Sequence, residues 1–255
     1  AKVMENSSYI GLSRQIALGR KMDIVSNNIA NIDTAGFRGE RPIFEEFVVK
    51  ATNKREVSLV QDFGVWRNNE PGPLKKTGSP FDFTTSKDTY FTINTDQGIR
   101  YTNNGRFQLA ADGTLVNLNG LPVLDNNENP IIITEEDGNI TVTDNGIING
   151  LQGEIAQFKI VSFDDLQTLK KVGGGLYETE SDPIDLTGDN QNDLIVKIDF
   201  TVKQGFFEGS NVKGILEMTR MMEVVRSYVS TANMLKTDHD LQRKAVDKLG
   251  QVVSA

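Results

Sequence analysis

The sequence contains no cysteine, and it has one histidine and one tryptophan among its 255 residues. Without cysteine, neither a disulfide framework nor a thiolate metal site can form. No apolar run reaches the roughly 18 residues that a membrane-spanning helix requires. The opening residues, Ala1 to Glu5, lack the apolar segment of a cleaved signal peptide. We therefore expect no membrane insertion, and we expect any export to use a route that does not read such a signal.

Acidic side chains outnumber basic ones, with 35 Asp and Glu against 27 Lys and Arg and a formal net charge of -8. A nucleic-acid-binding protein neutralises phosphates with clustered Lys and Arg, and the sequence shows no such cluster. The acidic balance is better explained by a need for solubility. We therefore expect no nucleic-acid partner.

Few residues in the sequence could perform catalysis or hold a metal ion. His239 lies between two Asp residues, but neighbouring side chains on a helix point about 100° apart, so we expect a solvated or interface histidine. Asp189, Gln191 and Asp193 have the spacing of the first ligands of a calcium loop. The next residue is Leu194, where such a loop requires glycine, and no bidentate Glu follows. We therefore expect no catalytic residue, no cofactor-binding residue and no metal ligand.

Apolar residues in the N-terminal segment, residues 8 to 33, repeat at helical spacing. One heptad stripe collects them: Leu18, Met22, Val25, Ile29 and Ile32. The spacing predicts a helix roughly 39 Å long, and Gly36 is suited to end it. Two internal glycines, Gly11 and Gly19, each weaken this helix by about 1 kcal/mol relative to Ala. We expect the helix to be marginal when isolated.

A second helical pattern fills the C-terminal segment, residues 211 to 249. Its stripe consists of Ile215, Met218, Met222, Val225, Val229, Ala232 and Leu235. Further apolar side chains, Met221, Val224 and Tyr228, lie beside the stripe, so the apolar face is wider than a two-stranded coiled coil requires. The width indicates more than one neighbour. An ordinary helical hairpin within one chain is the alternative explanation.

The central part of the chain has a strand-and-turn pattern. Four Asn-Gly and two Asp-Gly steps lie between residues 104 and 150, and such pairs favour tight hairpin turns. The predicted strands cover residues 90 to 94, 106 to 109, 114 to 117, 130 to 134, 140 to 143, 155 to 163 and 194 to 202. Residues 37 to 74 are less regular, and we expect them to form an extended connection.

These patterns predict an α+β protein, in which long N- and C-terminal helices pack together in a coiled-coil-like layer around a mostly antiparallel β-rich central domain. The expected divisions are a terminal helical assembly domain (1–36 with 208–255), an extended connecting segment (37–79) and the β-rich central domain (80–207). Helices at the two chain ends cannot bury a whole apolar face alone. The sequence therefore favours assembly with other subunits over catalysis.

Four segments resemble motifs of the bacterial flagellar rod and hook family. Residues 26 to 38 are similar to its N-terminal signature, (A/S)NN(L/I)AN followed by Thr and Gly-Phe-Lys/Arg. Residues 207 to 212 resemble Leu-Glu-x-Ser-Asn-Val, residues 101 to 107 resemble Tyr-Thr-Arg-x-Gly-x-Phe, and residues 77 to 82 resemble Thr-Gly-x-Pro-Leu-Asp. Asn103 departs from the pattern, because Arg is usual there. The matching signature residues are Asn28, Ala30, Asn31, Thr34, Gly36, Phe37, Ser210, Asn211 and Val212.

The resemblance implies a structural subunit of a tubular drive shaft that transmits torque, with terminal helices of many copies as the inner layer and β domains outside. It implies copies of this chain and other flagellar rod proteins as partners, location in the periplasm-spanning rod of the basal body, and export through the flagellar secretion channel, whose wall the rod helps to form. The chain length and the compact region after Phe37 are most similar to proximal-rod members. A distal-rod member is the competing interpretation, although such members usually carry a longer Gln- and Gly-rich extension.

The expected assembly interface comprises the two apolar stripes and three asparagines, Asn27, Asn28 and Asn31. A buried Asn can fix the register of packed helices, so these three residues are candidates for interhelical hydrogen bonds. Fraying of the helix end is the alternative reason for them. A secreted, trimeric β-rich adhesive module is the alternative function, in which the helices would serve only to form the trimer.

Overall fold

The computed structural model describes residues 2–51, 55–187 and 199–253, and it describes side chains within residues 10–43, 64–187 and 199–248. Two features of the sequence lie outside the described residues. They are the three residues with calcium-loop spacing, Asp189, Gln191 and Asp193, and most of the predicted strand 194–202. The chain is an α+β protein that divides into two compact units. The helical unit contains residues 1–30, 40–67 and 213–255, and the β unit contains residues 31–39 and 68–212.

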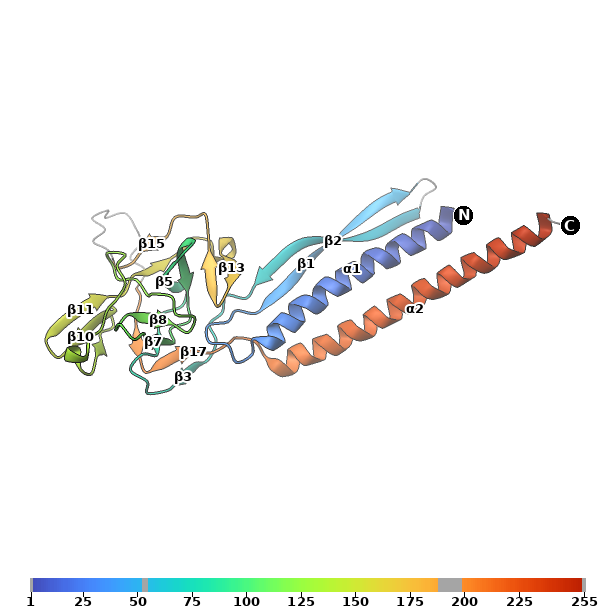
Figure 1. Cartoon of the computed structure of the whole chain (residues 1–255). Helices are drawn as coiled ribbons and strands as arrows, with labels where there is room; N and C mark the ends of the chain where they lie inside the picture. The colour runs from blue at the N-terminus through green and yellow to red at the C-terminus, as the bar shows by residue number, and fades with distance from the viewer. Residues whose placement is uncertain (1, 52–54, 188–198, 254–255) are drawn as a thin grey trace. The chain divides into compact units, whose positions relative to one another are not determined.

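Two helices and one β ribbon form the helical unit. Helix α1 spans Lys2–Ala30 and helix α2 spans Gly214–Val253. Strands β1 (Glu40–Ala51) and β2 (Arg55–Arg67) pair antiparallel, with Glu40 opposite Arg67 and Ala51 opposite Arg55. Helix α1 packs against α2 and against both strands of the ribbon (Figure 1). No helix among the described residues is long and apolar enough to cross a membrane.

The ribbon differs from the extended connection that the sequence predicted for residues 37–79. Residues 40–67 form one of the longest strand pairs of the structure, and they pack on α1. The segment was difficult to recognise for two physical reasons. The residues between the two strands, 52–54, contain neither Asn-Gly nor Asp-Gly, and Pro42 is unusual within a strand.

The largest sheet of the β unit has six strands in the order β13-β14-β6-β5-β12-β15. Their bounds are Lys170–Gly173, Leu176–Glu178, Gly98–Thr102, Thr89–Thr95, Ile160–Ser162 and Ile184–Asp185. A three-stranded sheet orders β11 (Gly153–Gln157), β10 (Ile147–Gly150) and β9 (Thr141–Val142). All strand pairs described in these two sheets are antiparallel.

Three small strand pairs and two short 3-10 helices complete the described part of the β unit. The pairs join β3 (Leu74–Lys76) to β17 (Phe206–Glu208), β4 (Phe83–Thr84) to β16 (Lys203–Gln204), and β7 (Phe107–Leu109) to β8 (Leu115–Asn117). The 3-10 helices span Glu135–Asp137 and Leu166–Thr168. The predicted strand at 130–134 forms only isolated bridges, such as Thr114 with Ile132.

Aromatic side chains form the centre of the β unit. Phe83, Phe91 and Phe158 are fully buried, and Phe107 is nearly so. The Phe83 and Phe158 rings meet edge to face at 5.1 Å, and Phe91 meets Phe107 in the same way at 5.3 Å. Edge-to-face pairs of this kind add to the stability gained from burial of the rings. The β unit therefore has a core of its own.

Candidate assembly surface and polar clasp

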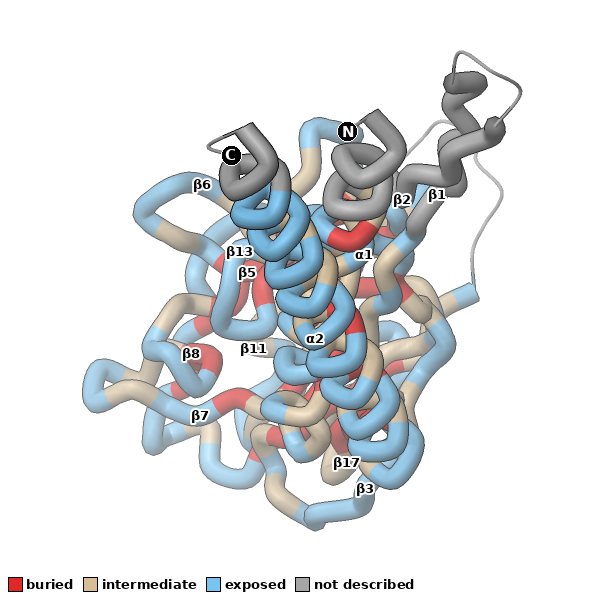
Figure 2. Tube along the Cα trace, turned by 90° about the vertical axis from the view of Figure 1, so that its right-hand side faces the viewer, coloured by how far each residue is buried: buried red, intermediate tan, exposed pale blue. Residues whose placement is uncertain are grey.

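Helix α2 presents part of its apolar stripe to solvent. We call this part the outer stripe; it comprises Ile215, Met218, Met222, Val225 and Val229, whose exposed fractions are 83%, 54%, 54%, 41% and 50%. Their alternating spacing of three and four residues places all five on one side of the helix. Figure 2 shows exposed and intermediate colours along most of α2, with few buried positions. The outer stripe is thus an apolar surface that the free chain does not cover.

A different face of α2 is used within the chain. Glu217, Val224 and Thr231 recur every seven residues, and each is at least 95% buried. At the next turn Leu235 meets α1 at Gly11, where an added Cβ atom would stand 2.5 Å from Leu235 Cδ2. Glycine at this position therefore permits the close approach of the two helices. Helix α2 accordingly has one apolar side against α1 and another facing outward.

The predicted stripe of α1 lies mainly inside the helical unit. Val25 is 3% exposed, and Leu18, Met22 and Ile29 are half-buried. The fifth predicted member, Ile32, is also half-buried but lies in the turn after α1, because the helix ends at Ala30 and not at residue 33. The two stripes that the sequence placed in one interface therefore differ in the structure. That of α1 is largely covered by the chain itself, whereas that of α2 is mostly open, with Ala232 and Leu235 half-buried at its end.

Asn28 joins three elements of the helical unit. Its side chain is 3% exposed and donates through Nδ2 to the Glu40 carbonyl oxygen at 2.8 Å and to Glu217 Oε2 at 3.3 Å. Its Oδ1 accepts from the Glu40 backbone N–H at 3.0 Å. Glu217 is also paired with Arg220. Asn28 thereby fixes the end of α1 to the starts of β1 and α2.

The other two interface asparagines have different surroundings. Asn27 is exposed on α1. Asn31 is half-buried, and its Oδ1 accepts from the Thr34 hydroxyl at 3.1 Å in the turn that follows α1. Hydrogen bonds between chains remain a prediction for all three asparagines, and for Asn28 such a bond would add to partners already present within the chain.

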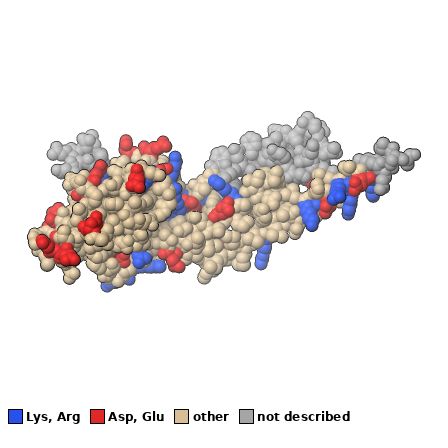
Figure 3. All heavy atoms as spheres, in the orientation of Figure 1, with Lys and Arg blue, Asp and Glu red and all other residues tan. Residues whose placement is uncertain are grey.

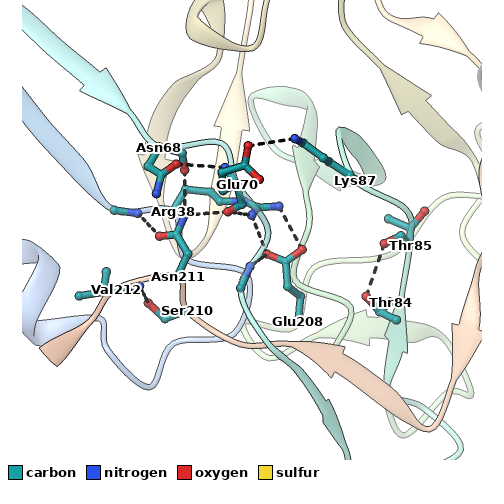
Figure 4. A network of polar contacts seen from close by, with 12 residues as sticks. Arg38, Asn68, Glu70, Thr84, Thr85, Lys87, Glu208, Ser210, Asn211 and Val212 are labelled. Atoms are coloured by element: carbon teal, nitrogen blue, oxygen red, sulfur yellow. Dashed lines mark hydrogen bonds and ion pairs between the residues drawn. The ribbon is translucent and has the colours of Figure 1, made fainter.

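A buried ion pair forms the centre of a second site, in the β unit. Arg38 Nη1 lies 3.0 Å from Glu208 Oε1, and the two side chains are 5% and 6% exposed (Figure 4). The Gly72 N–H donates to Glu208 Oε1 at 3.1 Å, and Arg38 also donates to the Glu70 carbonyl oxygen. These bonds matter because a buried charge without partners is strongly unfavourable.

The side-chain amide of Asn211 forms hydrogen bonds to the backbone near Arg38 and near Glu70. Its Oδ1 accepts from the Gly39 N–H at 2.7 Å, and its Nδ2 donates to the carbonyl oxygens of Asn68 at 2.9 Å and Glu70 at 2.7 Å (Figure 4). The Asn211 N–H donates to the Phe37 carbonyl oxygen at 3.2 Å. We call this group the polar clasp; it comprises residues 36–39, Asn68, Glu70, Gly72, Glu208 and Asn211. The clasp holds together three passages of chain that are far apart in sequence.

The remaining signature residues surround the clasp. Gly36 has φ +67° and its N–H donates to the Glu208 carbonyl oxygen at 2.8 Å. A Cβ atom on Gly36 would stand 2.9 Å from Asn103 Oδ1, so both the backbone angle and the space favour glycine. The Lys171 ammonium lies 4.1 Å from the centre of the Phe37 ring. Asn103, where the family pattern usually has Arg, is 5% exposed.

The last turn before α2 completes the C-terminal part of the signature. Ser210 is buried, and its hydroxyl accepts from the Val212 N–H at 3.2 Å. Ala30, in contrast, is exposed at the end of α1. The signature residues near the end of α1 and before α2 thus serve two local structures, one centred on Asn28 and one on the clasp.

Burial changes the acidity of two clasp-region carboxyls. Burial raises the pKa of Glu208, while Arg38 and the Gly72 N–H act in the opposite direction. Burial also raises the pKa of Asp88, against the attraction of Lys87 and Arg38. The ionised form of Glu208 is therefore less favourable in the folded chain than in water, in spite of its ion pair.

The described residues offer no alternative site with obvious chemistry. His239 is exposed on α2. No group of three or more His, Cys, Asp or Glu side chains within the described part of the chain is placed to hold a metal ion. Gly173, Gly174 and Gly175 have positive φ angles; Gly173 ends β13, and the other two form the turn between β13 and β14.

Sequence reasoning did not identify Arg38, Glu208 and Glu217 as site residues. Arg38 stands at the Lys/Arg position of the first quoted motif, Glu208 stands at the Glu position of the second, and Glu217 lies outside the quoted motifs. Only an indirect signal in the sequence points to Arg38 and Glu208. Each is a charged residue close to a motif pair, Gly-Phe or Ser-Asn, and a charged side chain in a buried motif needs a partner. The pairing of all three residues depends on contacts across 170 and 189 residues of sequence.

Three models of flagellar protein families match the chain. The model described as "Flagella basal body rod protein" matches residues 9–38, and "Flagellar hook protein FlgE/F/G D1 domain" matches residues 86–150. The model described as "Flagellar basal body rod FlgEFG protein C-terminal" matches residues 203–248. The matches include most of α1, the polar clasp residues Arg38, Glu208 and Asn211, and most of α2.

Relatives that align with nearly the whole chain are also named as flagellar basal-body rod proteins. The chain is 36% identical to "Flagellar basal-body rod protein FlgF" of Caulobacter vibrioides, over 98% of this chain and 100% of the relative. It is 31% identical to the protein of the same name from Mesorhizobium japonicum, over 97% of this chain and 99% of the relative. It is 28% identical to "Flagellar basal-body rod protein FlgG" of Bacillus subtilis, over 96% of this chain and 99% of the relative.

Proposed function

Since the chain belongs to the flagellar basal-body rod protein family and is a structural rod subunit, not an enzyme, we propose that it polymerises through its terminal helices into the tubular proximal rod. In this role it transmits torque as part of a drive shaft, and its inner layer forms part of the export channel wall. Its partners are copies of itself, other rod proteins and the flagellar export apparatus that delivers it.

The proximal position is supported by the pattern of identities. Relatives named FlgF are 36% and 31% identical to the chain, whereas the FlgG of Bacillus subtilis is 28% identical over a similar share. Residues 40–67 also contain only one Gln and one Gly, so this stretch carries no Gln- and Gly-rich extension. The competing assignment is a distal-rod subunit of the same family.

The observation that carries the proposal is the exposure of the outer stripe. From Ile215 to Val229 it extends for roughly 21 Å along the helix, and all five side chains are at least 41% exposed. Complete burial of one such side chain contributes about 1.5–3 kcal/mol. An apolar strip of this length on a helix is therefore a strong driving force for packing against another helix.

A coiled-coil-like inner layer follows from the two faces of α2. One face packs against α1 of the same chain at Gly11, and the outer stripe packs against a helix of a neighbouring subunit. Three asparagines at the end of α1 and in the turn after it contribute to register in this layer: Asn27, Asn28 and Asn31. The functional division we propose is a helical assembly unit of residues 1–30, 40–67 and 213–255, and an outer β unit for the remainder.

The experiment compares two adjacent substitutions on α2 in a strain that lacks its own copy of the gene. Val229→Asp places a charge on the outer stripe, whereas Ser230→Asp places the same charge on the neighbouring exposed polar face. We expect Val229→Asp to be exported and folded but absent from isolated basal bodies, and the cells to be non-motile. Ser230→Asp should restore motility. Normal rods with Val229→Asp would contradict the proposed interface.

The adhesive-module alternative has a distinct expectation. A trimer held by the helices would be a discrete particle, and Val229→Asp would change its oligomeric state without any effect on motility. The family matches at both chain ends favour the rod.

A further inference from the structure

Two of the five outer-stripe residues are methionines, and we infer that Met218 and Met222 form an oxidation-sensitive site that controls whether the stripe can be buried in the assembly. Both side chains are 54% exposed. The chain has six methionines and no cysteine, so thioether sulfur is the only sulfur that can react with a two-electron oxidant such as hydrogen peroxide. The inference rests on the proposed function, because the modified surface is the proposed interface.

The position of the pair distinguishes it from neighbouring methionines. Met218 and Met222 are one helical turn apart on the same side of α2, between Ile215 and Val225 of the outer stripe. Met221 and Met22 are only half-buried, but they lie off the outer stripe, Met221 beside it and Met22 on α1. Met234 is 51% exposed, but it too lies off the outer stripe, and its Cε would stand 3.3 Å from a Cβ atom on Gly11 of α1. Among the methionines whose side chains are described, Met218 and Met222 are thus the most exposed, and they are the two on the outer stripe.

The chemistry at each sulfur is a transfer of one oxygen atom. A sulfur lone pair attacks one oxygen of hydrogen peroxide, the S–O bond forms as the O–O bond breaks, and the departing hydroxide takes up the peroxide proton to leave as water. The thioether is oxidised by two electrons and the peroxide is reduced. Methionine sulfoxide can be returned to methionine by sulfoxide reductases, so the modification is reversible.

Oxidation converts the middle of an apolar strip into a polar one. A sulfoxide oxygen that becomes buried without a hydrogen-bond donor weakens the contact by roughly tenfold for each residue. The residues around the pair on the outer stripe, Ile215, Val225 and Val229, cannot donate a side-chain hydrogen bond. A subunit oxidised before assembly would therefore be excluded, while burial in the finished rod would protect the same two sulfurs.

The first test measures reactivity in the purified full-length chain. The chain is treated with hydrogen peroxide, and peptide mass spectrometry follows the gain of one oxygen at each methionine. We expect Met218 and Met222 to be oxidised roughly threefold or more faster than Met221 and Met22. Equal rates at all four positions would overturn the inference.

The second test measures incorporation in cells that lack the native gene. Glutamine imitates the length and polarity of methionine sulfoxide, so we expect Met218→Gln/Met222→Gln to lower incorporation into basal bodies by roughly a hundredfold. Leucine keeps the surface apolar, so Met218→Leu/Met222→Leu should incorporate normally and tolerate peroxide during rod growth. Thr219→Gln, on the exposed polar side, is the matched control and should have no effect.

Failure of this inference is distinguishable from failure of the proposed function. If Val229→Asp is excluded from basal bodies while the double glutamine variant is incorporated normally, the interface stands and the oxidation site is wrong. If Val229→Asp and the glutamine variant are both incorporated, the interface itself is wrong. Equal peroxide sensitivity of the leucine variant and the parent chain would also overturn the oxidation site.

Discussion

Gly36 occupies a position where two independent constraints meet. Its φ of +67° lies in the left-handed region, and its α-carbon faces Asn103 and the backbone of Asn104 at a distance that leaves no space for a side chain. Gly78 has a similar φ of +73°, but nothing lies within 4 Å of the place where its Cβ would be. A comparison of Gly36 with Gly78 therefore separates the energetic cost of a positive φ angle from the cost of a steric clash.

We expect Gly36→Ala to lower the free energy of unfolding of the β unit more than Gly78→Ala does. Gly78→Ala should cost about 1 kcal/mol, as expected for a left-handed backbone angle with a side chain. Gly36→Ala should cost about 2–4 kcal/mol because the clash with Asn103 and Asn104 adds to that strain. Urea unfolding followed by near-ultraviolet circular dichroism measures both. Equal losses would mean that the turn has space which the structure does not show.

Glu208 gives the clasp a dependence on pH. Burial holds its pKa in the folded chain above the unfolded value, so the folded state binds a proton more readily than the unfolded state does. The contribution of Glu208 to stability therefore increases as the pH falls from the raised pKa towards 4.5, the ordinary pKa of a glutamate in the unfolded chain. Its ionised form is the less favourable one in the fold.

The Glu208→Gln variant removes this titration while keeping the shape of the side chain. We expect the parent chain to gain stability relative to Glu208→Gln as the pH is lowered from 7 to about 5. Urea titrations of both proteins over this range measure the difference. If the difference stayed constant with pH, or changed in the opposite sense, the direction of the Glu208 pKa shift would be refuted.

At the scale of elements, helix α2 is a helix with two apolar sides. The side that carries Val224 is buried within the chain, and the side that carries Val225 is 41% exposed, although the two residues are neighbours in sequence. A rotation of about 100° between adjacent residues produces this separation. Helix α2 can therefore pack against α1 with one face and against a neighbouring subunit with the other.

An engineered disulfide tests the α1–α2 contact, because the native chain offers no competing cysteine. The Gly11→Cys/Leu235→Cys variant should form a bridge within one chain, since the Cβ position of residue 11 lies 3.0 Å from Leu235 Cγ. Non-reducing electrophoresis detects the bridge, and circular dichroism should show increased helix content in the free chain.

The matched control is Gly11→Cys/Ser230→Cys, whose second cysteine lies on the exposed polar face of α2. We expect no intrachain bridge in this control. Bridges of equal yield in both variants would indicate that α1 and α2 are not held in the register shown by the structure.

The sequence was a good guide to elements with strong local signals and a poor one elsewhere. Heptad spacing identified both helices, and Asn-Gly and Asp-Gly steps helped to identify β7 and β8. The β1–β2 ribbon was missed because the sequence between its strands lacks such a signal and the pairing must be inferred from a partner strand. Periodicity also gave the apolar residues of α1 and α2 but could not assign them to inner and outer faces.

At the scale of the whole molecule, charge is unevenly divided. The helical unit has 16 Lys and Arg against 12 Asp and Glu, whereas the β unit has 11 against 23. On the face drawn in Figure 3, acidic side chains are spread over the β unit, and both signs alternate toward the far end of α2. The acidity of the chain therefore belongs to the β unit, and repulsion between neighbouring β units should be reduced by salt.

Hydrogen exchange on the dilute, full-length chain tests how far the two units fold separately. We expect peptides from residues 2–30 and 213–253 to exchange faster than those of the β unit, because the glycines and asparagines of α1 and the uncovered outer stripe make these helices less stable without neighbours. Peptides from 31–39, 68–187 and 199–212 should be protected, since the clasp ties the first and last of these to the β unit.

The boundary of protection is the informative result. Protection that begins at residue 80 and leaves 31–39 unprotected would show that the clasp does not persist in the free chain. Slow exchange throughout would mean a self-contained particle and would favour a discrete oligomer over a rod that orders on assembly.

The division of the chain also determines how it would respond to a protease. The backbone passes between the two units four times, after residues 30, 39, 67 and 212, so neither unit is a continuous piece of sequence. A single cleavage within residues 40–67 would leave two fragments, each with part of its length in both units. A subunit cut there should keep both fragments together, because each unit contains residues from both fragments.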